Sequence, residues 1–326
     1  MRSKTFKSLD EQINILRDKG LVINDEDYAK EVLLRENYFF LNGYRHLFMK
    51  SKDKSRYIEG TKFEEVYSLF LFDRRLRNIL FKNILIIENN IKSIISYQLS
   101  KKYGYREKEY LKPSNFNTSF ECKRQVNDVI GKMKRQIKTN ATVHSATRHY
   151  ALNYGYIPLW VLVKVLSFGI VVELFSVLKK EDQYDIIEFY DLDLKTFMTG
   201  LNILSNYRNL CAHEDIVYEN RTQKYIEDCV YHRKLNIPMM DNEYIYGKND
   251  LYALIIILKS MLKDSEVNDL ILEIEDAVNN LDFNLRSIPI NKVLDRMGFP
   301  ENWKDIKGIQ KKELFWWKQV MNMKKI

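Results

Sequence analysis

The sequence predicts an all-α protein, with a helical core and helical extensions at both ends. Only 11 glycines and 5 prolines interrupt its 326 residues, so few positions favour a break in a helix. Apolar residues make up 45% of the chain, which excludes a disordered protein and is enough for a sizeable core. Apolar side chains recur at helical spacing over long segments, and we find no alternating strand pattern of any length.

The first 60 residues predict an N-terminal helical segment. Ser8 and Glu11 form the pattern of a capping box, and the helix that they begin is expected to end at Gly20. A second short helix follows. Residues 37–44, Asn-Tyr-Phe-Phe-Leu-Asn-Gly-Tyr, are rich in aromatic side chains. We expect them to form a packed corner, because aromatic rings bury large areas; a stacking platform for RNA bases is the alternative.

Residues 61–235 are expected to form the helical core, and a helix over residues 61–104 is its clearest element. Three charged residues lie inside its apolar pattern. Asp73, Arg77 and Glu88 fall within about 60° of one another on a helical wheel. One interpretation is a local ion-pair strip, since a carboxylate and a guanidinium four residues apart can pair. The other is a supporting role beside a phosphate site.

A helix over residues 120–139 carries many basic residues. Such a helix is usually a solvated face, but it is also the best candidate in this chain for contact with an RNA backbone. The net charge of +8 suits a partner made of phosphates, although many basic proteins bind nothing anionic. The candidate RNA-binding residues are Lys123, Arg124, Lys132, Lys134, Arg135, Lys138 and, in the following segment, Arg148.

The longest apolar run, residues 158–178, has the length to span a bilayer. It contains Lys164 and Glu173, and each such charge costs about 2.5–3.5 kcal/mol at a bilayer centre. We therefore expect a buried core helix, interrupted at residues 167–169, and no membrane partner. The three cysteines cannot all pair, and no apolar leader follows Met1. Both features predict a cytoplasmic protein.

A helix over residues 194–213 carries the densest polar chemistry in the chain. Asn202, Asn206, Asn209 and His213 lie within about 60° of one another and form a polar stripe. Buried carboxamides without partners cost about 1–3 kcal/mol each. A second copy of the helix across a two-fold axis would supply partners, so the stripe suggests a homodimer.

Arg208 and His213 have the chemistry that RNA cleavage without a metal requires. A histidine with a pKa near 6.5 can exchange protons with a ribose 2′-OH or a leaving 5′-oxygen, and a guanidinium can bind the phosphate. On a regular helix the two side chains diverge by about 140°. They converge only if the helix loosens near residues 211–214, if Arg208 uses its length, or if a partner copy contributes. The alternative is a structural histidine and a salt-bridging arginine.

Zinc is the competing chemistry. Cys211-x-His213 and Cys229-x-x-His232 supply suitable residue types, but Cys211 and His213 diverge by about 200° on a helix. The first pair also lacks a usual zinc-finger spacing. We find no phosphate-binding glycine loop, no Gly-x-Ser-x-Gly elbow and no His-Glu-x-x-His pattern. The sequence therefore predicts neither a metal nor another cofactor.

The last segment, residues 236–326, predicts a C-terminal helical extension. Helices are expected over residues 250–262, 267–281 and 289–297. The tail that contains Trp316 and Trp317 is expected either to dock on the core or to serve an interface.

These residues carry a resemblance to a known family. The segment from Tyr207 to His213 resembles the Arg-x4–6-His signature of the HEPN superfamily, and its surroundings resemble the Abi-like abortive-infection family of the AbiD/AbiF type. The likeness extends over most of residues 9–305. The matching pieces are residues 10–21, 36–44, 71–77, 158–163, 166–169 and 297–303.

The resemblance implies an HEPN-type helical bundle, usually a homodimer in which two motifs face each other. It implies a metal-independent ribonuclease that leaves a 2′,3′-cyclic phosphate and acts in antiphage defence by growth arrest. Glu214 and Asp215 depart from this picture, because they would repel phosphate or raise the pKa of His213. The implied catalytic residues are Arg208, His213 and Asn209, supported by Asp73, Arg77, Glu88 and Asn206.

Two other functions remain open at this point. Some AbiF-like proteins are associated with a small noncoding RNA, so the chain is alternatively a non-catalytic RNA-binding module that holds a structured RNA. The remaining interpretation is a toxin that an RNA partner restrains. In each case the expected partner is RNA.

Overall fold

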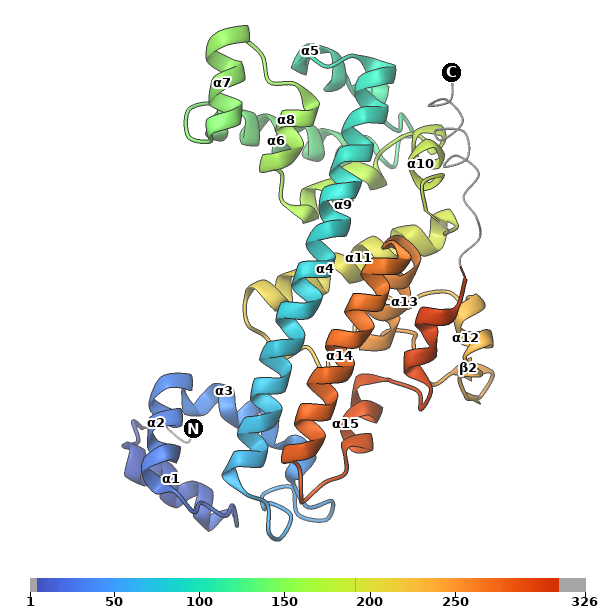
Figure 1. Ribbon diagram of the computed structural model, residues 1–326. Helices are drawn as coiled ribbons and strands as arrows, with labels where there is room; N and C mark the ends of the chain where they lie inside the picture. The colour runs from blue at the N-terminus through green and yellow to red at the C-terminus, as the bar shows by residue number, and fades with distance from the viewer. Residues whose placement is uncertain (1–4, 191, 311–326) are drawn as a thin grey trace.

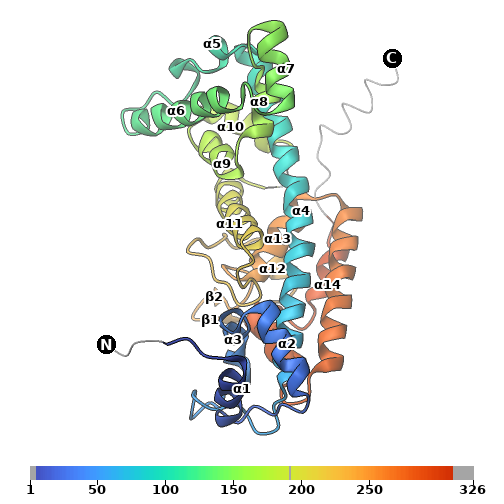
Figure 2. The same ribbon diagram turned by 90° about the vertical axis from the view of Figure 1, so that its left-hand side faces the viewer.

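One long helix organises the fold. The computed structural model describes residues 5–190 and 192–310. In it α4 (Phe63–Tyr103) has 41 residues and is therefore about 60 Å long. Figures 1 and 2 show α4 running from the N-terminal helices to a second group of short helices at the other end of the molecule. The all-α prediction is confirmed. Within the described ranges the one sheet is the antiparallel pair β1 (Met239–Met240) and β2 (Glu243–Tyr244).

The N-terminal helices pack beside the first turns of α4. The predicted capping box is present, because Oγ of Ser8 accepts the N–H of Glu11 at 3.2 Å and the Glu11 carboxylate accepts the N–H of Ser8 at 2.8 Å. Asn37 has a φ of 67° and separates the second helix from the third. These elements are α1 (Leu9–Asp18), α2 (Glu26–Glu36), α3 (Tyr38–Gly43) and the 3₁₀ helix η1 (Tyr44–Phe48).

The apolar run of residues 158–178 forms two buried helices. The first begins after Pro158, and the second begins where Oγ of Ser167 accepts the N–H of Ile170. The buried core is confirmed, and so is an interruption, which lies at residues 166–167 because Phe168 and Gly169 already belong to the second helix. In the part of the chain that the structure describes, no helix has the length and apolar character to cross a membrane. The elements here are α5 (Glu107–Tyr110), η2 (Pro113–Asn115), α6 (Lys123–Asn140), α7 (Ser145–Tyr154), α8 (Leu159–Val165), α9 (Phe168–Ser176) and α10 (Lys180–Ile187).

α11 (Leu194–Ala212) packs against α4 and also against α13 (Leu251–Met261), in which every residue is buried. Gly200 permits close packing of α11 on α13, since a Cβ at this position would lie 3.0 Å from Cδ1 of Ile257. The three predicted C-terminal helices are confirmed. Trp316 and Trp317 lie outside the described residues. The remaining elements are α12 (Val230–Lys234), α14 (Asp264–Asn284), α15 (Ile290–Met297) and η3 (Trp303–Gly308).

α14 lies along α4, as Figure 1 shows. Two surface ion pairs join these helices: Lys82 with Glu273 and Arg75 with Asp276, each at 2.5 Å. The division into segments 1–60, 61–235 and 236–326 stays a prediction.

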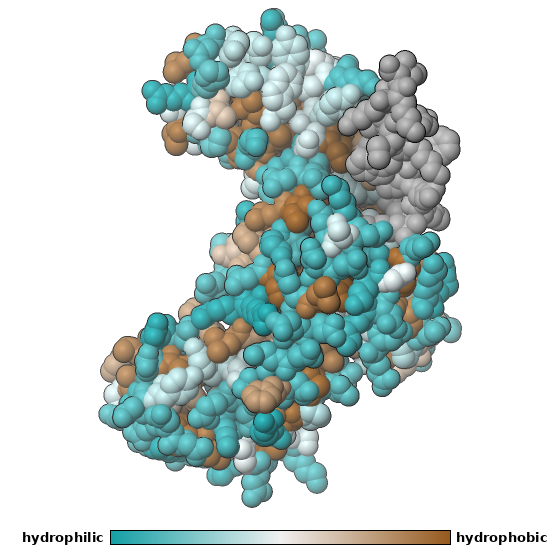
Figure 3. All heavy atoms as spheres, viewed as in Figure 1, coloured by the Kyte–Doolittle hydropathy of each residue, from teal (hydrophilic) through white to brown (hydrophobic). Residues whose placement is uncertain are grey.

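The molecule is hollowed on one side. Figure 3 shows a concave outline on the left, between the end formed by α5–α8 and the end formed by α1–α3. Figure 2 looks onto that side and shows α11 between the two ends. The last turns of α11 and the loop after it reach this side of the molecule (Figure 1). The motif that the sequence analysis singled out therefore lies at the hollow.

Candidate functional site

His213 ends α11 and is exposed to solvent. Its backbone N–H donates to the carbonyl of Asn209 at 3.0 Å, which keeps the helix regular through the motif. Glu214 then takes a left-handed φ of 58°, and the N–H of Asp215 donates to the carbonyl of Leu210 at 3.0 Å. This bond from the second residue beyond the cap is the Schellman closure of a helix. The helix does not loosen before His213, so loosening does not bring Arg208 and His213 together.

Arg208 turns toward α4. Its Nε lies 3.6 Å from Oε2 of Glu88, and its Cζ lies 5.9 Å from the ring centre of Phe81. Glu88 also binds Nζ of Lys92 at 2.6 Å. At 3.6 Å the contact between Arg208 and Glu88 is an ion pair without a hydrogen bond. Both Nε of Arg208 and Oε2 of Glu88 have no hydrogen-bond partner among the described residues. The Arg208 side chain is 30% exposed, and its guanidinium is held by charge rather than by a hydrogen bond to Glu88.

The predicted polar stripe faces solvent. Asn202, Asn206, Asn209 and His213 are all exposed, while the apolar side chains on other faces of α11 are buried. Asn206 accepts a hydrogen bond from the side chain of Asn220 at 3.2 Å, across the loop. These exposed side chains can form hydrogen bonds with water, so the cost of burying an amide without a partner does not arise in a single chain. A second copy that covers it stays a prediction.

Asp73 holds the loop that follows the motif. This fully buried carboxylate accepts hydrogen bonds from the N–H groups of Tyr218 at 2.8 Å and Val217 at 3.3 Å. It also accepts the hydroxyl of Tyr44 at 2.8 Å and pairs with Arg77 at 2.6 Å. Burial raises the pKa of Asp73 to about 6, and the charge of Arg77 acts in the opposite direction. At neutral pH the group is therefore still a carboxylate.

Arg77 completes this arrangement. Its Nη1 donates to Asp73, to the hydroxyl of Tyr44 at 3.1 Å and to the carbonyl of Asp215 at 3.4 Å. The ion pair that the sequence suggested within α4 is therefore present, and it also fixes the chain directly after His213. Glu88 lies eleven residues further along α4 than Arg77 and contacts Arg208 instead.

The cysteines and the other candidate zinc ligand are accounted for separately. The N–H of Cys229 donates to Nδ1 of His232 at 3.1 Å, and Nε2 of His232 lies 2.9 Å from the carbonyl of Gly247. Burial lowers the pKa of His232 and raises the pKa of the Cys211 thiol to about 12. Across residues 5–190 and 192–310 no three Cys, His, Asp or Glu side chains are grouped at a spacing suited to a metal ion.

The basic helix is confirmed as α6 and lies at the α5–α8 end of the molecule (Figure 1). Lys132 is engaged in ion pairs with Asp128 at 2.8 Å and Glu173 at 2.6 Å. The other predicted RNA-binding residues have no ion pair with any described residue and are exposed: Lys123, Arg124, Lys134, Arg135, Lys138 and Arg148. The structure does not place them beside Arg208.

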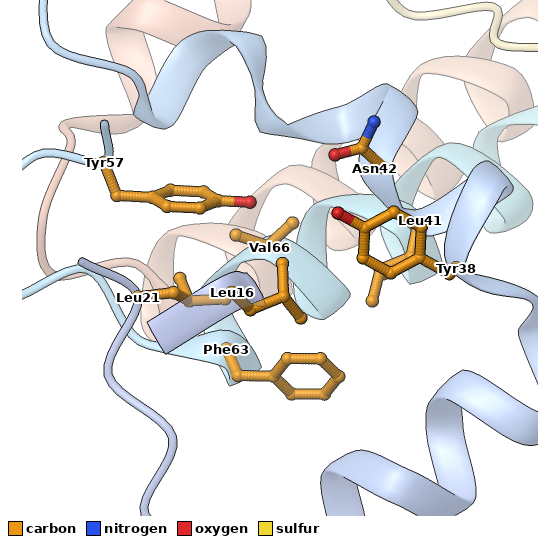
Figure 4. A pocket seen from close by; sticks show the side chains of 8 residues that line it. All are labelled: Leu16, Leu21, Tyr38, Leu41, Asn42, Tyr57, Phe63 and Val66. Carbon is orange, nitrogen blue, oxygen red and sulfur yellow. The ribbon is translucent and has the colours of Figure 1, made fainter. Parts of the chain in front are cut away.

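The aromatic segment 37–44 is only partly a packed corner. Leu41 and Tyr44 are buried, and Figure 4 shows that Leu41 lines the same small pocket as Leu16 and Val66. The void there is only about 10 Å³. The prediction is wrong for Phe39 and Phe40, which are 74% and 54% exposed. Leu41 is the buried residue of the short helix α3, and the other side of this helix, which carries the two rings, stays in solvent.

Beside these two rings is a cavity of about 340 Å³ that sequence reasoning missed. Its wall includes Glu214, Asp215 and Ile216, the residues that directly follow the motif. The helices that contribute the rest are α2, α3, η1 and α4. The side chains that line it from these helices include Arg35, Glu36, Phe39, Phe40, Arg45, Phe70, Arg74 and Arg77.

Comparison with known proteins bears on the identity of the chain. No curated protein and no solved structure matches it. The sequence model of one family, described as Abi-like protein, matches residues 31–219, which is more than half of the chain. The matched stretch contains the motif, its loop and the cavity, and it leaves out the resembling pieces at residues 10–21 and 297–303. Membership suggests a part in abortive infection, a defence against phage. The chain belongs to the Abi-like protein family.

Proposed function

We propose that this protein is an abortive-infection effector that cleaves RNA without a metal ion, through Arg208 and His213. The observation that carries the proposal is the end of α11. There an exposed imidazole directly precedes a loop that buried Asp73 holds in place. Five residues earlier, Arg208 is only loosely held by Glu88. Both groups are those that metal-free cleavage of RNA needs, in a chain of the Abi-like family.

The proposed reaction breaks one bond and forms one. Neutral His213 takes the proton of a ribose 2′-OH, and the 2′-oxygen attacks the adjacent phosphorus. The bond to the 5′-oxygen breaks, giving a 2′,3′-cyclic phosphate and a 5′-hydroxyl. Arg208 binds the non-bridging oxygens and stabilises the charge that develops on them. Asn209, on the same face as His213, supports the phosphate or the sugar.

One histidine cannot serve as base and acid in the same step. The leaving 5′-oxygen needs a proton, and His213 has just accepted one. A second copy of the chain, with its own stripe against the first, would supply a protonated imidazole. The proposal therefore includes a homodimer across the exposed stripe of α11.

The test is to incubate wild-type protein and His213→Ala with cellular RNA in the presence of a chelator and to map the fragment ends. We expect wild type to leave cyclic phosphate ends and His213→Ala to cleave at least about 100-fold more slowly, the usual range for losing a general acid or base. His149→Ala removes another exposed imidazole, on α7, and should cleave normally. Cleavage that required a divalent metal, or that survived in His213→Ala, would refute the mechanism.

A second candidate function rests on α6. Five of its basic side chains are exposed and unpaired with any described residue, as expected of a surface that follows an RNA backbone. On this alternative the protein holds a structured RNA without cleaving it. A toxin that such an RNA restrains would instead depend on Arg208 as the first function does. Arg208→Ala separates the two functions. If the protein is a ribonuclease, this variant should abolish cleavage. If the protein only binds RNA, the variant should leave RNA binding and growth arrest unchanged.

A further inference from the structure

The cavity beside the end of α11 has the size of a ligand site. Its volume of about 340 Å³ lies within the range of roughly 300–1,000 Å³ that small-molecule sites occupy. One wall is the loop after His213, and Gly43 at the end of α3 lets that wall approach closely. A Cβ on Gly43 would lie 2.9 Å from Cδ1 of Ile216. The cavity is thus fixed in position relative to the motif, because Asp73 and Arg77 hold the same loop.

Two aromatic rings line the cavity and remain largely in solvent. Phe39 and Phe40 lie 6.0 Å apart between ring centres, nearly edge to face. The buried side chains of Leu41 and Tyr44 hold the helix that carries them. Exposed aromatic rings that line a cavity are typical of sites that stack on the flat bases of single-stranded RNA.

Three of the arginines that line the cavity are neutralised by ion pairs, and the charges that remain unpaired favour a base over a bare phosphate. Glu214 and Asp215 line it and form no ion pair with any described residue, and their negative charges would repel a phosphate. Arg45 lines it too and has only a hydrogen bond to Oδ1 of Asn42, at 2.6 Å. Arg74 is held by two hydrogen bonds to Glu36. Carboxylates accept hydrogen bonds and guanidinium groups donate them, so the cavity offers both to a neutral ring.

Guanine matches this combination of carboxylate acceptors and guanidinium donors better than the other three bases. Its N1–H and N2–H₂ groups lie side by side and suit one carboxylate, while its O6 and N7 atoms accept from a guanidinium. We propose that the cavity binds a guanine base of the RNA substrate, in a nucleotide next to the one that is cleaved. This inference rests on the proposed function, and it gives the acidic pair Glu214–Asp215 a role that phosphate binding does not.

The experiment measures binding in the His213→Ala protein, so that cleavage does not interfere. The ligands are labelled single-stranded RNA oligonucleotides that differ only in having one guanine replaced by adenine, cytosine or uracil. We expect the oligonucleotide with guanine to bind about tenfold more tightly than the other three, because a side chain that forms two hydrogen bonds to a base provides discrimination of about this size. Phe39→Ala/Phe40→Ala should weaken its binding by about tenfold, through lost stacking.

Two further variants make the result specific. Glu214→Gln/Asp215→Asn should remove the preference for guanine and strengthen binding of the other three oligonucleotides, because two repulsive charges are lost. Phe283→Ala removes a ring that is equally exposed, at 75%, on α14, and should leave binding unchanged. Guanosine monophosphate alone, added as a competitor, should bind far more weakly than the oligonucleotide.

Several results would overturn the inference: equal binding of all four oligonucleotides, no effect of the Phe39/Phe40 substitutions, or guanosine monophosphate binding as tightly as RNA. If wild-type protein cleaves RNA with no base preference, the guanine site is refuted and the proposed ribonuclease stands. If the protein binds guanine selectively but never cleaves, the site stands and the ribonuclease is refuted.

Discussion

At the scale of single residues, the buried carboxylate of Asp73 holds the backbone of the candidate site in one conformation. Asp73 touches neither Arg208 nor His213, yet its hydrogen bonds fix the backbone of Val217 and Tyr218 and, through Arg77, that of Asp215. Such a group acts by positioning the chain. Its loss should therefore affect the loop more than the chemistry of the imidazole itself.

Asp73→Ala should destabilise the protein by about 3–5 kcal/mol, because it leaves Arg77 as an unpaired buried charge. The double variant Asp73→Leu/Arg77→Leu should recover much of that loss, since apolar pairs often replace buried ion pairs without cost. It should still lack an ordered loop, because the N–H groups of Val217 and Tyr218 no longer have an acceptor. Urea unfolding reports the first effect, and hydrogen exchange at residues 215–218 reports the second. Normal protection of this loop in the double variant would contradict the positioning role.

At the scale of elements, α11 ends in a conformation that its sequence does not favour. Glu214 has a φ of 58°, in the left-handed region that glycine adopts readily and other residues adopt at a cost. A glutamate at a position that suits glycine indicates that stability has been given up there. The proposed contact of this carboxylate with a base is a reason for keeping it.

Glu214→Gly should raise the free energy of unfolding by up to about 1 kcal/mol. Glycine relieves a left-handed strain of about 1–2 kcal/mol, and the entropy that it adds to the unfolded chain takes back about 0.4–1 kcal/mol. The urea midpoint should rise without a change in slope. Glu214→Ala is the control, since it removes the same carboxylate and keeps the strain. If alanine stabilises the protein as much as glycine, the relevant effect is repulsion between the two carboxylates and the backbone argument fails.

At the scale of the whole molecule, the basic charges and the motif lie in different places. The exposed cations of α6 are at the α5–α8 end, and the end of α11 reaches the hollow between that end and the N-terminal helices (Figures 1 and 3). An RNA strand that contacts both has to run along the hollow. Mutations can then change the attraction of RNA by the cations of α6 without changing the motif at the end of α11.

Lys134→Glu/Arg135→Glu should weaken RNA binding and make it less dependent on salt. Single strands lose about 0.7 in the slope of log affinity against log salt for each phosphate contact removed, so we expect a change of about 1.4. Lys52→Glu/Lys54→Glu makes the same change in charge in an exposed loop near the N-terminal helices and should change the slope little. Equal effects of both variants would show that net charge, rather than α6, attracts the RNA.

Local patterns predicted most of the elements, and long-range contacts decided what the patterns left open. The capping box at Ser8 and the helix that ends at His213 depend on neighbours in sequence, so their residues predicted them. The contact of Arg208 with Glu88 joins two helices far apart in the chain, and helical wheels contain no such information. The exposure of Phe39 and Phe40 depends on which side of α3 Leu41 anchors, and that is a tertiary choice.

The hydrogen bonds from Tyr218 and Val217 to Asp73 also bear on how the protein is made. Asp73 and Tyr218 are 145 residues apart, which a ribosome takes about 7–29 s to synthesise at 5–20 residues per second. During that time α4 has been made, but its carboxylate has no loop to hold. A nascent chain therefore cannot assemble the proposed site, and the proposed ribonuclease would become active only after translation of its own chain has passed residue 218.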